Sequence, residues 1–262
     1  MKKIGFIGCG KMASAIISGA KNKYEIIASE INEEFANNAQ KRLEIKVFSN
    51  NIDLVKNSDI VFIATKPNQV ENVLKEIKDN TNEDKLVVSI AAGVTTEKIE
   101  NILTNNRIIR IMPNTPALVK LGMFGICKGS KATDKDLEFI EEFLSNIGKC
   151  ISVTESQMDI VTAISGSGPA FFYQVIEDIA RAGEKLGLEY EKSLTLATQT
   201  ALGSAQMIFN REETPVQTLI DNVATKGGCT FVGIEEMKNQ NSSKLFYDVI
   251  DKTTQKANAL GK

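Results

Sequence analysis

The chain has 262 residues, of which 42% are hydrophobic and 24% are charged, and it contains no histidine. This composition is typical of a soluble globular protein that forms one large domain or two smaller ones. The net charge of −2 includes no block of like charges, which argues against a nucleic-acid or anionic-membrane partner, and the missing histidine excludes Ser-His-Asp and Cys-His catalysis.

The first thirty residues predict a dinucleotide-binding turn. The pattern G-x-G-x-x-A from Gly8 to Ala13 follows an apolar strand over residues 4–7 and opens a helix. A second strand over residues 24–29 ends at Glu30, about 20 residues on, where an acid can bind a ribose 2′-hydroxyl. An ordinary tight turn is the alternative, but the order strand, turn, helix, strand and acid favours nucleotide binding.

Strands and helices continue to alternate along the next eighty residues. We predict strands over residues 46–48, 59–64, 85–90 and 107–112, and helices over residues 33–43, 53–57, 68–79 and 97–103. Thr96 is expected to cap the last of these helices. Alternation of this kind implies a parallel sheet, with its ligands at the carboxyl ends of the strands. The turns at 64–67, 91–93 and 113–115 should therefore form one site with the glycine turn.

The pattern changes near residue 155. Two more strands are predicted over residues 123–127 and 150–153, with a helix over 133–146, and every later segment has helical spacing. We therefore predict an α/β dinucleotide-binding domain of the Rossmann type, with a doubly wound and mostly parallel sheet, over residues 1–155. An all-helical domain should follow over residues 156–262. Small residues at 198–205 suggest that its helices form a tight bundle.

The cysteines and the hydropathy suggest a location. The four cysteines, Cys9, Cys127, Cys150 and Cys229, have no zinc-site spacing, so no metal site is expected. Scattered unpaired cysteines suit a reducing compartment, and no apolar stretch is long enough to span a membrane. These features predict a cytoplasmic protein.

Two later stretches are candidates for specificity. Ser165–Phe172 contains Ser-Gly-Ser-Gly-Pro and marks either a helix restart or a purely structural kink. Asp221–Phe231 contains two glycines and hydroxyls before a helix. Such a loop is either a nest of N–H donors for an anion such as a carboxylate, or a plain turn with a Thr cap.

Six fragments, in order along nearly the whole chain, carry a more specific signal: GFIGCGKMA, ATKPN, SIAAGV, MPNTPA, SGSGPAFF and DNVATKGGCTFVGIEEM. Together they resemble the pyrroline-5-carboxylate reductase family. The resemblance implies an oxidoreductase that reduces 1-pyrroline-5-carboxylate to L-proline with NADPH or NADH, the last step of proline biosynthesis. It also implies a homodimer formed through the helical domain, and a further assembly of dimers into a larger ring.

The resemblance assigns roles by position. The cofactor residues it implies are Ile7, Gly8, Cys9, Gly10, Lys11 and Met12 at the pyrophosphate, Glu30 at the ribose, Asn51 near the adenine, Ala64, Thr65, Lys66, Pro67, Ile90, Ala91 and Ala92 at the nicotinamide, and Asn222 from the helical domain. The substrate residues it implies are Thr225, Gly228 and Cys229 at the carboxylate, Thr230 as the catalytic group at the ring nitrogen, and Glu155 nearby.

The chain departs from the family pattern at two places. Many members have Ser, or Asn followed by Arg, where this chain has Ser29-Glu30. Glu30 would repel a 2′-phosphate, so we expect NADH to be preferred over NADPH. In the carboxylate loop the usual Ser-Pro becomes Thr225-Lys226, which frees the loop and adds a positive charge near the anion site.

Three other functions are alternatives. One is reduction of a related cyclic imine, and another is a reaction of a 2-hydroxy acid on the same scaffold. β-Hydroxyacid dehydrogenases use a lysine of the helical domain, for which Lys185 and Lys192 are candidates by residue type alone. The third is a non-catalytic dinucleotide sensor, which has no need to keep the intact loop around Thr230.

Overall fold

The computed structural model describes residues 2–260 and divides into two compact units. One unit comprises the chain through Pro169 together with the chain from Lys252 onward, and the other comprises Ala170–Asp251. The compact units thus divide later than the boundary predicted between residues 155 and 156. One reason is that Val161 packs directly against Gly125 of the sheet, where a β-carbon would have no room.

The first unit is built on an eight-stranded sheet with the order β3-β2-β1-β4-β5-β6-β7-β8. All neighbours are parallel except β6 and β7, which are antiparallel. The strands are β1 (Lys3–Ile7), β2 (Glu25–Ser29), β3 (Lys46–Phe48), β4 (Ile60–Ile63), β5 (Leu86–Ser89), β6 (Arg107–Met112), β7 (Gly122–Lys128) and β8 (Gly148–Ser152). The predicted α/β class with a mostly parallel sheet is confirmed.

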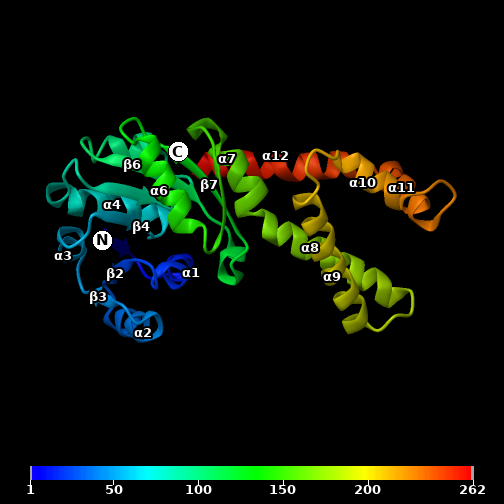
Figure 1. Ribbon diagram of the computed structural model, residues 1–262, viewed down its shortest axis with the longest axis horizontal. Helices are drawn as coiled ribbons and strands as arrows, with labels where there is room; N and C mark the ends of the chain where they lie inside the picture. The colour runs from blue at the N-terminus through cyan, green and yellow to red at the C-terminus, as the bar shows by residue number, and fades with distance from the viewer. Residues whose placement is uncertain (1, 261–262) are drawn as a thin grey trace. The chain divides into compact units, whose positions relative to one another are not determined.

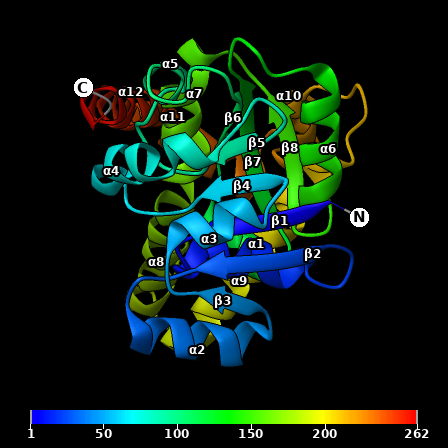
Figure 2. The same ribbon diagram turned by 90° about the vertical axis from the view of Figure 1, so that its left-hand side faces the viewer.

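Helices cover both faces of this sheet, so its central strands are buried on both sides and consist of continuous apolar runs. On one face the core includes side chains from α1 (Lys11–Ala20), α2 (Glu33–Leu43) and α6 (Asp134–Leu144). On the other it includes side chains from α3 (Asn51–Lys56), α4 (Pro67–Ile77) and α5 (Thr96–Glu100). Figure 2 shows β3, β2, β1 and β4 side by side with α3 and α4 next to them. This doubly wound arrangement gathers the strand ends at one edge.

The cap of α5 differs from the prediction. Thr95, not Thr96, is the N-cap, and its hydroxyl accepts a hydrogen bond from the Lys98 amide at 3.2 Å. Thr96 lies one residue inside the helix, where its hydroxyl donates to the Glu155 carboxylate at 2.8 Å. The two adjacent threonines are equivalent as caps in the sequence, and the structure distinguishes them because the Thr96 hydroxyl is bonded to Glu155.

The stretch Ser165–Phe172 is a helix restart. A short 3-10 helix, η2 (Thr115–Val119), lies between β6 and β7. After β8 the chain forms η3 (Glu155–Gln157), α7 (Met158–Val161) and a π-helical turn, η4 (Thr162–Gly166). The helix α8 (Gly168–Lys185) then begins, with Pro169 as its second residue. Proline is accepted in a first helical turn because its missing N–H has no partner there.

The second unit exposes most of its apolar side chains. It continues α8 and contains α9 (Tyr190–Phe209), α10 (Val216–Val223), α11 (Cys229–Asn239) and the first part of α12 (Ser242–Leu260). Of residues 170–251, which are all described, those that are buried are Ala180, Ser193 and Ala197. Large apolar side chains such as Phe209, 64% exposed, lie on the surface. Figure 1 labels α9, α10 and α11, the helices that lie wholly within this unit.

The tight bundle predicted from the small residues at 198–205 is therefore wrong for the single chain. A β-carbon on Gly203 would meet nothing within 4 Å. The close approach of α8 and α9 lies elsewhere, at Gly183, whose β-carbon would come within 2.5 Å of the Ser193 hydroxyl. An exposed apolar surface of this extent is typical of a protein–protein interface.

Candidate functional site

The predicted glycine turn has the geometry that a bound pyrophosphate requires. Gly8 has φ +96°, and a β-carbon there would lie 2.9 Å from the Ala64 carbonyl oxygen. Gly10 is the N-cap of α1, so no side chain of the cap residue bonds the first N–H groups of the helix. A β-carbon on Gly10 would point into open space. Ala13 is buried at the close contact between helix and sheet. The first turn of α1 is therefore open to an anion, which the helix dipole favours.

A cavity of about 840 Å³ lies beside this turn. Of the residues assigned to the cofactor, those that line it are Ile7, Gly8, Cys9, Gly10, Glu30, Asn51, Ala64, Thr65 and Lys66. Those that do not line it are Lys11, Met12, Pro67, Ile90, Ala91 and Ala92 within the first unit, and Asn222, which belongs to α10. The carboxyl ends of β1, β2 and β4 thus meet at one hollow, as expected for a parallel sheet.

The cavity has further walls that the sequence analysis missed. These residues are Ser29, Ile31, Asn32, Phe35, Gln69, Asn72, Val73 and Glu76. Gln69, Asn72, Val73 and Glu76 lie on α4 at intervals of three and four, so one face of that helix runs along the cavity. The sequence predicts a helix over residues 68–79, but nothing in the sequence marks this face of the helix as the wall of a cavity.

The chemistry of the cavity suits a nucleotide. The side chain of Thr65 buries its hydroxyl oxygen without a hydrogen-bond partner among the described residues, which leaves that hydroxyl available to a ligand. Burial and the nearby charge of Glu30 raise the pKa of the Cys9 thiol to about 11, although Arg42 opposes the shift. Cys9 therefore contributes an uncharged thiol to the lining of the cavity and does not act as a nucleophile.

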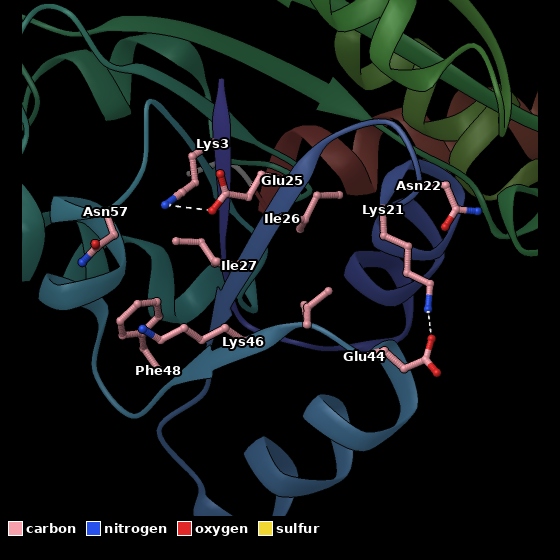
Figure 3. Close-up of a pocket in the computed structure, with 11 residues that line it drawn as sticks. Lys3, Lys21, Asn22, Glu25, Ile26, Ile27, Glu44, Lys46, Phe48 and Asn57 are labelled. Atoms are coloured by element: carbon pink, nitrogen blue, oxygen red, sulfur yellow. Dashed lines mark hydrogen bonds and ion pairs between the residues drawn. The ribbon is translucent and has the colours of Figure 1, made fainter. Parts of the chain in front are cut away.

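A second hollow, of about 560 Å³, is lined by residues of β1, β2 and β3, near the points where β1 and β2 begin (Figure 3). Its lysines have partners within the protein. Lys3 pairs with Glu25 at 2.8 Å, and Lys21 pairs with Glu44 at 2.6 Å. Lys46 lies over the ring of Phe48, 4.4 Å from its centroid. Since parallel sheets bind ligands at their carboxyl ends, this hollow is not the nucleotide site.

Glu155 belongs to a partly buried cluster in the first unit. One carboxylate oxygen pairs with Arg110, which is 2% exposed, and the other accepts from the Thr96 amide at 3.1 Å. Burial opposes ionisation of Glu155, but the Arg110 charge and the hydrogen bonds from Thr96 outweigh it and hold the pKa of the carboxyl below its usual value. Burial and the Glu155 charge raise the pKa of the Cys127 thiol to about 12, so this thiol stays protonated and donates to Glu155 at 3.4 Å.

The predicted carboxylate loop lies in the second unit. It follows α10, and Gly227 turns the chain with φ +82°. Gly228 is then the N-cap of α11 and makes no side-chain cap hydrogen bond. Thr225 and Cys229 are exposed, and Thr230 lies in the first turn of the helix. Backbone N–H groups at such an open helix start can bind a carboxylate.

Comparisons with known proteins cover the whole chain. Residues 155–260 match the family model "Pyrroline-5-carboxylate reductase dimerisation", and residues 3–93 match "NADP oxidoreductase coenzyme F420-dependent". The pyrroline-5-carboxylate reductase of Methanosarcina acetivorans is 38% identical and aligns with 100% of this chain and 98% of its own length. The chain belongs to the pyrroline-5-carboxylate reductase family. The predicted family is thereby confirmed, as is its class, the NAD(P)H-dependent oxidoreductases.

Solved structures of the pyrroline-5-carboxylate reductase family have the same fold. The Coxiella burnetii pyrroline-5-carboxylate reductase superposes with a TM-score of 0.92 at 32% identity, over 100% of this chain and 99% of its own. A Plasmodium falciparum pyrroline carboxylate reductase with NADP bound superposes with a TM-score of 0.87 at 32% identity, over 100% and 98% of the two chains. Among the residues that our structure describes, no helix has the length and hydropathy needed to cross a membrane.

Proposed function

We propose that this chain reduces 1-pyrroline-5-carboxylate to L-proline by hydride transfer from NAD(P)H. The observation that carries the proposal is the open glycine turn beside the 840 Å³ cavity, in a chain that aligns with this family over its full length. The lack of histidine fits, because a bound cofactor supplies the hydride and no side-chain nucleophile is needed.

The cofactor half of the site is proposed as follows. Residues 7–12 hold the pyrophosphate, chiefly through the N–H groups at the start of α1. Glu30 and Asn51 lie at the adenosine half of the cavity. Residues 64–67 and 90–92 hold the nicotinamide, and Asn222 contributes from the helical region.

The substrate half of the site is proposed to be the loop before α11. Thr225, Gly228 and Cys229 hold the substrate carboxylate, chiefly through the backbone N–H of Cys229, because the Gly228 N–H already donates to the Thr225 carbonyl at 2.9 Å. The Thr230 hydroxyl bonds the ring nitrogen. Glu155 is proposed as a further substrate-binding residue, and its carboxylate is held by an ion pair with Arg110. Lys192, the candidate of the rival hydroxyacid mechanism, pairs with Glu189 at 3.0 Å.

The chemistry then depends mainly on position. The C=N carbon is most electrophilic when the nitrogen is protonated, and the iminium can form in solution. Hydrogen bonds to the carboxylate and to the nitrogen orient the ring so that one face points toward the hydride donor. Orientation of this kind can lower the reaction barrier by roughly 7–11 kcal/mol at best. The amine product takes its proton from water.

Cofactor choice follows from Glu30. Its carboxylate lines the cavity and accepts a hydrogen bond from the Asn32 amide at 3.3 Å, which holds it near the ribose position. We expect a lower KM for NADH than for NADPH by roughly tenfold or more, because like charges about 4 Å apart repel by on the order of 1–4 kcal/mol.

Steady-state kinetics with both cofactors test this preference. Glu30→Gln should reduce the ratio of the KM for NADPH to the KM for NADH. Glu34→Gln, the same charge change at an exposed position of α2, should leave this ratio unchanged. A clear preference of the unaltered enzyme for NADPH would contradict the role of Glu30.

Assembly and location are part of the proposal. The exposed apolar side chains of residues 170–251 would be buried in a homodimer formed through the helical region, and dimers would assemble further into a ring. We place the protein in the cytoplasm, since its four cysteines are free thiols that suit a reducing compartment.

An assay of cofactor oxidation separates this function from its rivals. Pyrroline-5-carboxylate, a six-membered cyclic imine and a small 2-keto acid are compared as oxidants of NADH. We expect the five-membered substrate to have the highest kcat/KM. The six-membered ring should differ by about 1–3 kcal/mol in the barrier, the usual value of one methylene. Oxidation with the keto acid alone would refute the proposal, and nucleotide binding without any oxidation would indicate a sensor.

A further inference from the structure

The adenosine end of the nucleotide cavity contains a chain of three polar side chains. The Ser29 hydroxyl donates to the Asn51 side-chain oxygen at 2.8 Å, and the Asn51 side-chain nitrogen donates to a Glu76 carboxylate oxygen at 2.8 Å. Ser29 is fully buried and Asn51 is 2% exposed. All three residues line the cavity, and Ser29 directly precedes Glu30.

This chain fixes the position of one carboxylate. Because the Asn51 amide is held from both sides, it can offer only its N–H to Glu76. The other oxygen of Glu76 accepts no hydrogen bond from the part of the chain that the structure describes. Glu76 therefore presents an oriented acceptor to the cavity.

A flat apolar surface lies in the same cavity. Phe35, on α2, is 63% exposed and lines the hollow together with Ile31. An exposed aromatic ring beside a ligand cavity suits a stacked base. A carboxylate only accepts hydrogen bonds, so the base it matches is one that presents an N–H donor at its edge.

We propose that Glu76, held by Asn51, accepts a hydrogen bond from the exocyclic amino group of the adenine of the cofactor and thereby selects adenine over 6-oxopurines. A 6-oxopurine presents a carbonyl oxygen at this position, which leaves two acceptors facing each other. A site built to accept from an N–H rejects an analogue that lacks it. The inference rests on the nucleotide binding proposed for this cavity.

The test is a binding measurement on the full chain, without substrate. The dissociation constants of NAD⁺ and of nicotinamide hypoxanthine dinucleotide are measured by titration calorimetry. We expect the unaltered protein to bind NAD⁺ about tenfold more tightly, the usual value of one hydrogen bond. Glu76→Gln should reverse or abolish the preference, because its carbonyl can still accept from Asn51 while its amide donates into the cavity.

The matched control is Glu71→Gln, the same change on the same helix. Glu71 pairs with Lys75 at 2.6 Å and does not line the cavity, so the preference should be unchanged. Equal affinity of the unaltered protein for the two nucleotides would overturn the role of Glu76 alone, whether or not the variants fold. Binding of neither nucleotide would overturn the proposed function as well.

Discussion

Replacing Glu155 by alanine is expected to lower the free energy of unfolding by about 3 kcal/mol. The change leaves the guanidinium of Arg110, 2% exposed, without its counter-charge. The expected loss is at the low end of what removing one partner of a buried ion pair costs, because the Glu155 side chain itself remains 31% exposed. Urea unfolding followed by circular dichroism measures the difference.

Two controls distinguish the ion pair from a general loss of charge. Glu138→Ala removes an exposed acid of α6 and should change stability by less than about 0.5 kcal/mol. The double change Arg110→Met with Glu155→Leu removes both charges and should recover most of the loss. Equal stability of Glu155→Ala and the unaltered protein would show that the cluster does not stabilise the fold.

The same pair predicts a dependence on pH. The pKa of Glu155 is lowered in the folded protein, so its stabilising contribution is present above the unfolded pKa and is lost as the pH falls through the folded pKa. Glu155→Gln should therefore lose less stability than the unaltered protein on acidification from neutral pH to about pH 3. Parallel acid unfolding curves would contradict this assignment.

Replacing Thr230 by valine is expected to lower kcat/KM for pyrroline-5-carboxylate by roughly 10–150-fold, with no change in cofactor affinity. The range corresponds to a lost hydrogen bond to a charged group, about 1.5–3 kcal/mol. Valine keeps the shape of threonine, and Thr230 lies in the first turn of α11, so the helix itself should persist. Steady-state kinetics give the first quantity and nucleotide titration gives the second.

The neighbouring residue provides the comparison. Cys229 is exposed and is proposed to act through its backbone N–H, so Cys229→Ala should turn over within about twofold of the unaltered enzyme. Normal turnover by Thr230→Val would remove Thr230 from the mechanism. A loss confined to cofactor affinity would place it at the nucleotide instead.

The sheet and its nucleotide edge could be predicted from the sequence because both depend on local signals. Strands buried on both faces, such as β4 and β5, are continuous apolar runs. The glycine turn is recognisable because Gly8 adopts a positive φ that other residues avoid. The helix restart near Pro169 was also predictable from local sequence, because proline is accepted in the first turn of a helix.

What the sequence did not predict depends on partners far along the chain. Arg110 interrupts an apolar strand, and nothing near it identifies its partner 45 positions away at Glu155. The Asn51–Glu76 bond joins two helices in the same way. The small residues at 198–205 suggested packing within one chain, whereas the helices of that unit expose apolar surface that a partner chain would cover.

Transfer of deuterium from the cofactor to the product tests the proposed reaction most directly. The full-length enzyme is incubated with pyrroline-5-carboxylate and NADH that carries deuterium on the transferred position of C4, and the product is analysed by mass spectrometry and NMR. We expect L-proline with one deuterium at C5, formed in equal amount to the oxidised cofactor. Oxidation of the cofactor without labelled proline, or no oxidation above buffer, would contradict the proposed function.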